Sequence, residues 1–103
     1  MAETISRLEQ WYVSQCDDDW EHQYGIKIDT LDNPGWSVEV DLLDTALMAR
    51  EFREVNHERS DSDWIRCRVR DGKFEGFGGV RNLGEVIEVF LSWAEKSESP
   101  NAM

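Results

Sequence analysis

Two stretches of alternating apolar and polar residues, each followed by a turn signal, most constrain the fold of this chain. In the first, Ile26 and Ile28 alternate with charged residues in residues 24–31, and apolar side chains occupy every second position of residues 36–42. Alternation of this kind is typical of half-buried strands. The connection, residues 32–35, reads Asp-Asn-Pro-Gly, which predicts a type II turn with Gly35 at the position of positive φ.

The second stretch begins at Ile65 and alternates apolar residues with three arginines. Asp71-Gly72 then supplies a two-residue hairpin signal, and residues 73–77 are predicted to form the returning strand. Three arginines on one face of a strand repel one another unless carboxylates lie opposite them. The candidates for this cross-strand pairing are Glu39, Asp41 and Glu75.

Helical periodicity marks both ends of the chain. Residues 4–15 carry an apolar stripe at spacings of three and four, with Thr4 as N-cap, and residues 83–94 carry a wider stripe with Asn82 as N-cap. A third strand is expected within residues 51–58, on a poorer alternation. The predicted inward residues of the first helix are Ile5, Leu8, Tyr12 and Cys16. Those of the last helix are Leu83, Val86, Ile87, Phe90, Leu91 and Ala94.

The order of these elements predicts an α+β fold. It comprises an N-terminal helix, a four- or five-stranded antiparallel sheet and a C-terminal helix, with both helices packed on one sheet face. A chain of 103 residues is long enough for one core. We therefore expect a single domain over residues 1–96, followed by a disordered tail at residues 97–103.

The charge balance is strongly acidic and uneven. The chain has 22 acidic and 11 basic residues, for a net charge of −11, and the acidic excess is concentrated in the first half. Such a surface repels nucleic acid and attracts a basic partner over long range. Binding to nucleic acid is therefore disfavoured, and a basic protein partner is favoured.

The chain carries no apolar segment long enough for a signal peptide or a membrane span. A cytoplasmic location without membrane association is expected. Cys16 and Cys67 have no spacing typical of a metal or redox site, so both are predicted to be buried thiols.

Residues 11–36 combine three of the five tryptophans with a run of carboxylates, Asp17, Asp18, Asp19 and Glu21. Unpaired charges are too costly to bury, so this acidic run must face water or a cationic partner. Trp20, within the run, either anchors it to the core or serves as an exposed contact of the kind that tryptophan often makes in interfaces. The sequence leaves both alternatives open.

A catalytic function for the acidic run or the histidines has less support from the sequence. The acidic run and His22 offer oxygen and imidazole ligands, so a small metal-dependent hydrolase using Asp17–His22 is an alternative function. The run lacks the spacing of known metal motifs, and no nucleophile motif accompanies His22 or His57. The glycines of residues 76–79 are better explained by close packing than by phosphate binding. We therefore expect no catalytic residues, no metal site and no cofactor.

The same region resembles a family of bacterial immunity proteins. Trp-Tyr at 11–12, Gln-Cys-Asp at 15–17, Asp-Trp-Glu-His at 19–22, Tyr-Gly-Ile at 24–26 and Thr-Leu-Asp-Asn-Pro-Gly-Trp at 30–36 resemble the pattern of the immunity protein 53 family of polymorphic toxin systems. With Gly79 and Asn82-Leu83, the resemblance covers residues 5–95. The family pattern often has glycine where this chain has Asp18. The resemblance implies a small α+β protein that neutralises a cognate toxin by binding it.

Taken together, these observations predict an immunity protein that binds a basic toxin domain through an acidic, aromatic-containing surface. Steering by carboxylates would be followed by aromatic burial at the centre of the contact. A self-associating structural module is a further alternative, and the oligomeric state is left open. The predicted partner-binding residues are Asp17, Asp18, Asp19, Trp20 and Glu21, followed by Glu39 and Asp41 on the second strand.

Overall fold

The computed structural model describes residues 2–96, and residues 97–103, the predicted tail, lie outside the described part. Three α-helices, five β-strands and one short 3₁₀ helix follow one another along these residues. Their bounds are α1 Ala2–Gln15, α2 Trp20–Gln23, β1 Ile26–Leu31, β2 Gly35–Asp41, η1 Ala46–Ala49, β3 Val55–Ser60, β4 Asp63–Arg70, β5 Lys73–Gly78 and α3 Leu83–Ala94.

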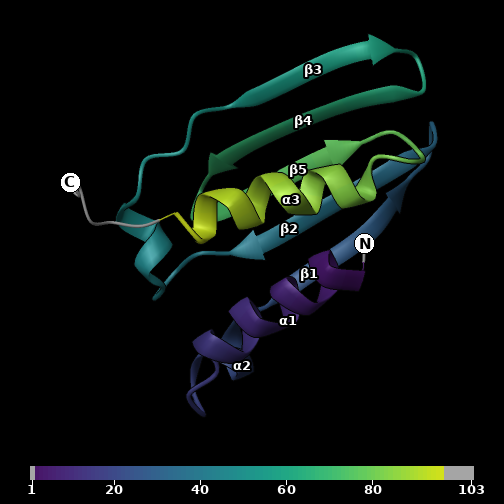
Figure 1. The fold of residues 1–103 in the computed structure, drawn as a ribbon. Coiled ribbons are helices and arrows are strands. Elements are labelled where there is room, and N and C mark those ends of the chain that lie inside the picture. The colour runs from purple at the N-terminus through teal and green to yellow at the C-terminus, as the bar shows by residue number, and fades with distance from the viewer. Residues whose placement is uncertain (1, 97–103) are drawn as a thin grey trace.

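The five strands form one antiparallel sheet in the order β1-β2-β5-β4-β3. Figure 1 shows α1 and α3 on the same side of this sheet, α3 across its centre and α1 alongside β1. The predicted α+β fold is therefore confirmed, with five strands rather than four. The expected third strand is present but begins at Val55, four residues later than residue 51.

The β4–β5 hairpin follows its sequence signal. Asp71 and Gly72 have φ values of 56° and 76°, the pair of positive φ angles that a two-residue type I′ turn requires. The twist of that turn matches the twist of the strands. This brings β4 and β5 into register, with Val69 opposite Phe74 and Arg68 opposite Glu75.

The β1–β2 turn differs from its prediction. Gly35 does not have a positive φ; it is the first residue of β2 and pairs with Leu31. Its requirement for glycine is steric, because a Cβ there would collide with the carbonyl oxygen of Gly78 on β5. The turn motif therefore predicted the position of the β1–β2 connection correctly. The physical reason for glycine at residue 35 is instead the close approach of β2 and β5.

The core lies between α3 and the sheet. Val86, Ile87, Phe90 and Leu91 of α3 are fully buried, as the stripe predicted, and they pack with Phe74 in one hydrophobic cluster. Two glycines of β5, Gly76 and Gly78, lie beneath Val86. Their missing side chains let the helix lie close to the strand, which confirms the packing role expected for this glycine-rich segment.

The inward face of α1 was predicted incorrectly. Leu8 is buried, but Ile5 and Tyr12 are exposed by 38% and 37%. The residues that turn toward the core lie one position back around the helix, where Trp11 contacts Phe90 edge-on at a centroid distance of 5.0 Å. Thr4 is an inner residue of the helix rather than its cap, and its hydroxyl donates a hydrogen bond to Glu88 of α3.

Three smaller predictions also need correction. Cys67 is fully buried, but Cys16 at the end of α1 is only partly so. Asn82 precedes α3 but makes no side-chain cap; its amide instead donates to Asp63 and Glu85, at 2.9 and 3.0 Å. Ile28 was expected to face the core and is 41% exposed, because β1 is an edge strand that α1 covers only in part.

The sheet face opposite the helices carries the arginines of β4. Of the three carboxylates predicted to pair with them, Glu75 does so, at 2.7 Å from Arg68 and 3.9 Å from Arg70. Glu39 and Asp41 cannot, because β5 lies between β2 and β4. Strand order and register decide this pairing, since only residues directly or diagonally opposite on adjacent strands come close enough.

Candidate functional site

The acidic segment Asp17–Glu21 forms a defined turn between α1 and α2. A carboxylate oxygen of Asp17 accepts hydrogen bonds from the backbone N–H groups of Asp19, at 3.1 Å, and Trp20, at 2.9 Å. Short acidic side chains favour helix starts for this reason, because they satisfy N–H groups that have no partner within the helix. Asp17 therefore fixes the backbone conformation of the segment that carries Asp18, Asp19 and Glu21.

Glu21 completes the turn from the other side. Its two carboxylate oxygens accept the backbone N–H groups of Asp17 and Asp18, both at 2.9 Å. Backbone hydrogen bonds, first its own N–H and then those of Asp17 and Asp18, hold the pKa of Glu21 below its ordinary value. Asp18 has a φ of 70°, a left-handed conformation that glycine adopts readily and aspartate tolerates.

Trp20 anchors the turn. Its side chain is only 3% exposed, and its ring meets Trp11 edge-on at a centroid distance of 6.0 Å. The indole N–H donates a 2.9 Å hydrogen bond to the carbonyl oxygen of Leu43, in the loop that follows β2. Of the two alternatives that the sequence left open, the structure places Trp20 as an anchor to the core, and its ring is not available at the surface.

The anchored turn lies at the end of the sheet where β1 begins and β2 ends. Asp41 accepts a 2.9 Å hydrogen bond from the backbone N–H of Gly25, and its own N–H donates to the carbonyl of Gly25. Glu39, two residues earlier, lies 4.0 Å from Lys73. The predicted acidic residues of the turn and of β2 are therefore brought to the same end of the molecule, but those of β2 already have partners.

Two residues at this end were not singled out from the sequence. Leu43 is 41% exposed and directly follows the buried Leu42, and Asp44 is an exposed carboxylate with a φ of 63°. The Leu42-Leu43 pair interrupts the alternation of β2, so one of the two leucines had to face outward. That break was the available signal for an exposed apolar residue beside the acidic turn.

The acidic turn places four carboxylates without a cationic partner close together in the chain. Among residues 2–96, ion pairs engage carboxylates of the sheet, of α3 and of the residue that follows α3: Glu39, Asp63, Glu75, Glu85, Glu88 and Glu95. Within the same residues, none of Asp17, Asp18, Asp19 and Glu21 forms an ion pair. The carboxylates of Asp17 and Glu21 instead accept hydrogen bonds from backbone N–H groups, and that of Asp19 accepts one from the side-chain amide of Gln23 at 2.9 Å.

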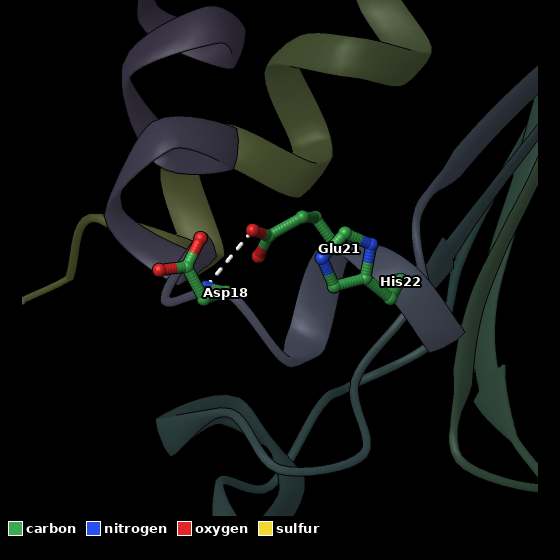
Figure 2. Close-up of side chains that lie close together, drawn as sticks. All are labelled: Asp18, Glu21 and His22. Carbon is green, nitrogen blue, oxygen red and sulfur yellow. Dashed lines mark hydrogen bonds between the residues drawn. The ribbon is translucent and has the colours of Figure 1, made fainter.

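The turn also contains the one candidate metal cluster found among the described residues. Ligand atoms of Asp18, Glu21 and His22 lie within 4.8 Å of one another, and Figure 2 shows the Glu21 carboxylate turned toward the backbone N–H of Asp18. Both oxygens of Glu21 are engaged in shaping the turn. The position of Glu21 in this cluster is thus explained by its hydrogen bonds to the backbone of Asp17 and Asp18.

Cys67 and Ser14, which carry a thiol and a hydroxyl, are poorly placed to act as nucleophiles. Cys67 is fully buried under α3, and burial raises the pKa of its thiol to about 12; only the thiolate is a good nucleophile. The hydroxyl of Ser14 donates a 2.6 Å hydrogen bond to the backbone carbonyl of Trp11 in its own helix, and within residues 2–96 it makes no hydrogen bond to a histidine. His57 lies exposed on the edge strand β3.

Fold and site together define a small α+β protein with one well-formed acidic surface turn. Within residues 2–96, no helix is both long and apolar enough to cross a membrane. The family model described as Immunity protein 53 matches residues 5–95, and the chain belongs to this family. No curated protein and no solved structure matches the chain.

Proposed function

We propose that this chain is a cytoplasmic immunity protein that neutralises a cognate toxin by binding it, without catalysis of its own, and that the acidic turn is the first contact. Membership of the Immunity protein 53 family supports the general role. The observation that carries the surface assignment is that four carboxylates without a cationic partner among the described residues, Asp17, Asp18, Asp19 and Glu21, lie together in one turn. A basic toxin surface would supply the missing positive charge.

The conformation of the turn suits this role. Trp20 and the hydrogen bonds of Asp17 and Glu21 fix the backbone, so binding need not order it. Charges that are held in place and unpaired accelerate encounter with an opposite charge. Leu43 supplies exposed apolar area beside them, and apolar contacts at the centre of an interface contribute much of its affinity.

The residues of the predicted surface take different parts in this proposal. Asp18 and Asp19 present carboxylates to the partner, while Asp17, Trp20 and Glu21 hold the turn in shape. Glu39 and Asp41 contribute to the negative field of this end of the sheet. Their existing contacts with Lys73 and Gly25 make them the weaker contributors.

The proposal is tested with the double variant Asp18→Asn/Asp19→Asn and the cognate toxin, which is sought first as the product of the neighbouring gene. Asparagine keeps the shape of both side chains and tolerates the positive φ of residue 18, so the fold should be preserved. We expect the association rate constant, measured by stopped-flow or surface binding, to fall roughly three- to tenfold at low salt, and its salt dependence to become shallower.

The matched control is Asp32→Asn/Asp61→Asn, which removes the same charge from exposed turns at the opposite end of the strands. It should leave the association rate nearly unchanged. Equal rates for both double variants would contradict the role of the acidic turn. If the wild-type chain neither captures the neighbouring gene product nor restores growth when that product is expressed, the immunity role itself is wrong.

A further inference from the structure

The two edge strands of the sheet are protected to different degrees. β3 carries Asn56, His57, Glu58 and Arg59, and its register shifts at Glu58/Ser60. Charged side chains and bulges of this kind discourage a further strand from pairing. β1 instead presents Ile26 and Ile28 on the helix-facing side of its edge and shows no register shift.

The backbone groups that β1 leaves free follow from its hydrogen bonding. Asp41 and Gly25 are opposite each other, and the N–H of Asp41 donates to the carbonyl of Gly25. Because bonded and non-bonded pairs alternate in an antiparallel ladder, Lys27, Asp29 and Leu31 bond to β2. The N–H and C=O groups of Ile26, Ile28 and Thr30 therefore point away from the sheet, toward open space at the edge.

An apolar groove accompanies this edge. It has a volume of about 370 Å³ between α1 and β1 and is lined by Ile5, Leu8, Glu9, Tyr12, Gly25 and Ile26. It exposes Ile5 and Tyr12 of the α1 stripe, which were predicted to be buried, and Ile28 adds further exposed apolar surface on the same side. α1 lies beside β1 on the helix-bearing side of the sheet (Figure 1). A strand added to β1 would run beneath α1 and cover the groove.

We propose that the occupant is β1 of a second copy of this chain, paired antiparallel about a twofold axis at Ile28. In this register, Ile28 exchanges both backbone hydrogen bonds with Ile28 of the second copy. Ile26 lies opposite Thr30 of the second copy. The N–H and C=O groups of Ile26, Ile28 and Thr30, which point away from the sheet in one copy, therefore bond to each other across the dimer. Lys27 lies opposite Asp29 of the second copy, twice, on the open sheet face. The result is one continuous ten-stranded sheet.

Charge complementarity selects this partner and this register. Centring the axis on Lys27 or Asp29 would place like charges directly opposite each other, which is destabilising, and would use residues already bonded to β2. Centring it on Ile26 or Thr30 would lose the opposition of Lys27 and Asp29. The segment Ile26–Thr30 is therefore complementary to itself in one symmetric arrangement. Within the described residues, neither Lys27 nor Asp29 forms an ion pair that would compete.

One existing hydrogen bond would be exchanged on pairing. The carboxylate of Asp29 now accepts the outward N–H of Thr30 at 2.8 Å. In the dimer, that N–H bonds to Ile26 of the second copy, and the carboxylate turns to Lys27. Since one strand edge and one groove form a modest interface, we expect a reversible dimer that dissociates on dilution.

The test measures molar mass by light scattering after size exclusion, over protein concentrations from about 1 µM to several hundred µM. The wild-type chain should shift from monomer toward dimer as concentration rises. Lys27→Asp and Asp29→Lys should each remain monomeric, because each places like charges opposite one another twice. A mixture of the two variants should form a heterodimer, since every facing pair is again opposite in charge.

The mixed heterodimer distinguishes pairing from damage to the fold, because two misfolded variants would not restore each other. Lys96→Asp and Asp61→Lys make matched charge changes at exposed sites away from β1 and should dimerise as the wild type does. A chain that is monomeric at every concentration, or dimers unaffected by both β1 variants, would overturn the proposal. It is independent of toxin binding, which the growth assay reports separately.

Discussion

At Gly76, the absence of a side chain decides how closely α3 can approach the sheet. A Cβ at this position would overlap Val86 of α3 and press on the ring of Phe74. These neighbours are fully buried and have no free space into which to move. Trp20 has the corresponding role at the acidic turn, which its buried indole holds in place through the hydrogen bond to the carbonyl oxygen of Leu43. Single residues thus set both the packing distance and the site.

Gly76→Ala should therefore destabilise the protein by overpacking, by about 1–3 kcal/mol in the free energy of unfolding. Gly25→Ala provides a matched control, because no atom lies within 4 Å of a Cβ built there and its φ is not positive. Its effect should stay within about 0.5 kcal/mol. Urea denaturation of both variants measures the difference, and equal stabilities would contradict the packing role assigned to Gly76.

At the scale of elements, α1 is attached to α3 by polar contacts as much as by apolar ones. Arg7 donates to Glu88 at 2.9 Å and to Glu95 at 2.8 Å, and Thr4 also donates to Glu88. Hydrogen bonds to Thr4 and then to Arg7 lower the pKa of Glu88, and the hydrogen bond to Arg7 lowers that of Glu95. The helix pair is thus sensitive to protonation of two glutamates.

The sign of this pH dependence follows from the lowered pKa values. The folded state holds the protons of Glu88 and Glu95 less tightly than the unfolded chain does, so these contacts stabilise the fold above the ordinary pKa of glutamate, about 4.3. The contribution is lost as the pH falls through the folded values. Arg7→Met should reduce stability near neutral pH and flatten the decline of stability below a pH of about 5.

Denaturation midpoints measured from neutral pH to about pH 3 would show this effect. Arg53→Met is a suitable control, because Arg53 is exposed and makes no ion pair within residues 2–96. It should follow the wild-type pH profile. Parallel profiles for the wild type and Arg7→Met would mean that the two glutamates do not couple α1 to α3.

At the scale of the whole molecule, the two cysteines differ in how accessible their thiols are in the folded protein. Cys67 lies in the centre of β4, fully buried beneath α3, and burial raises the pKa of its thiol to about 12. Reaching it requires separation of α3 from the sheet, which removes most of the core. Cys16 lies at the end of α1 beside the acidic turn and is partly accessible.

Iodoacetamide should accordingly modify one thiol quickly in the native protein and the second only after denaturation. Mass spectrometry of the intact protein counts the modified thiols, and peptide mapping assigns the fast one to Cys16. Cys67→Ala should retain the fast reaction and lose the slow one. Rapid native modification of both thiols would show that α3 separates from the sheet more readily than this core implies.

The sequence by itself determined the kinds of element, their order and the α+β class. The alternation of the strands, the Asp-Gly turn and the apolar stripe of α3 are local sequence patterns. Each predicted an element that is present in the tertiary structure. It also determined that the carboxylates of residues 17–21 must be solvated, because burying them unpaired would be too costly. The family pattern was readable from the same residues.

Only the tertiary structure decided which apolar faces are covered and which acids are free. The stripe of α1 was assigned to the wrong face because helical spacing does not say where the neighbouring elements lie, and Trp11 rather than Tyr12 meets Phe90. Strand order placed β5 between β2 and β4, so Glu75 alone of the three candidates pairs with the arginines. Trp20 became an anchor because Leu43, 23 residues away in the chain, offered its carbonyl oxygen. Each of these outcomes depends on contacts between segments distant in sequence, which no local pattern encodes.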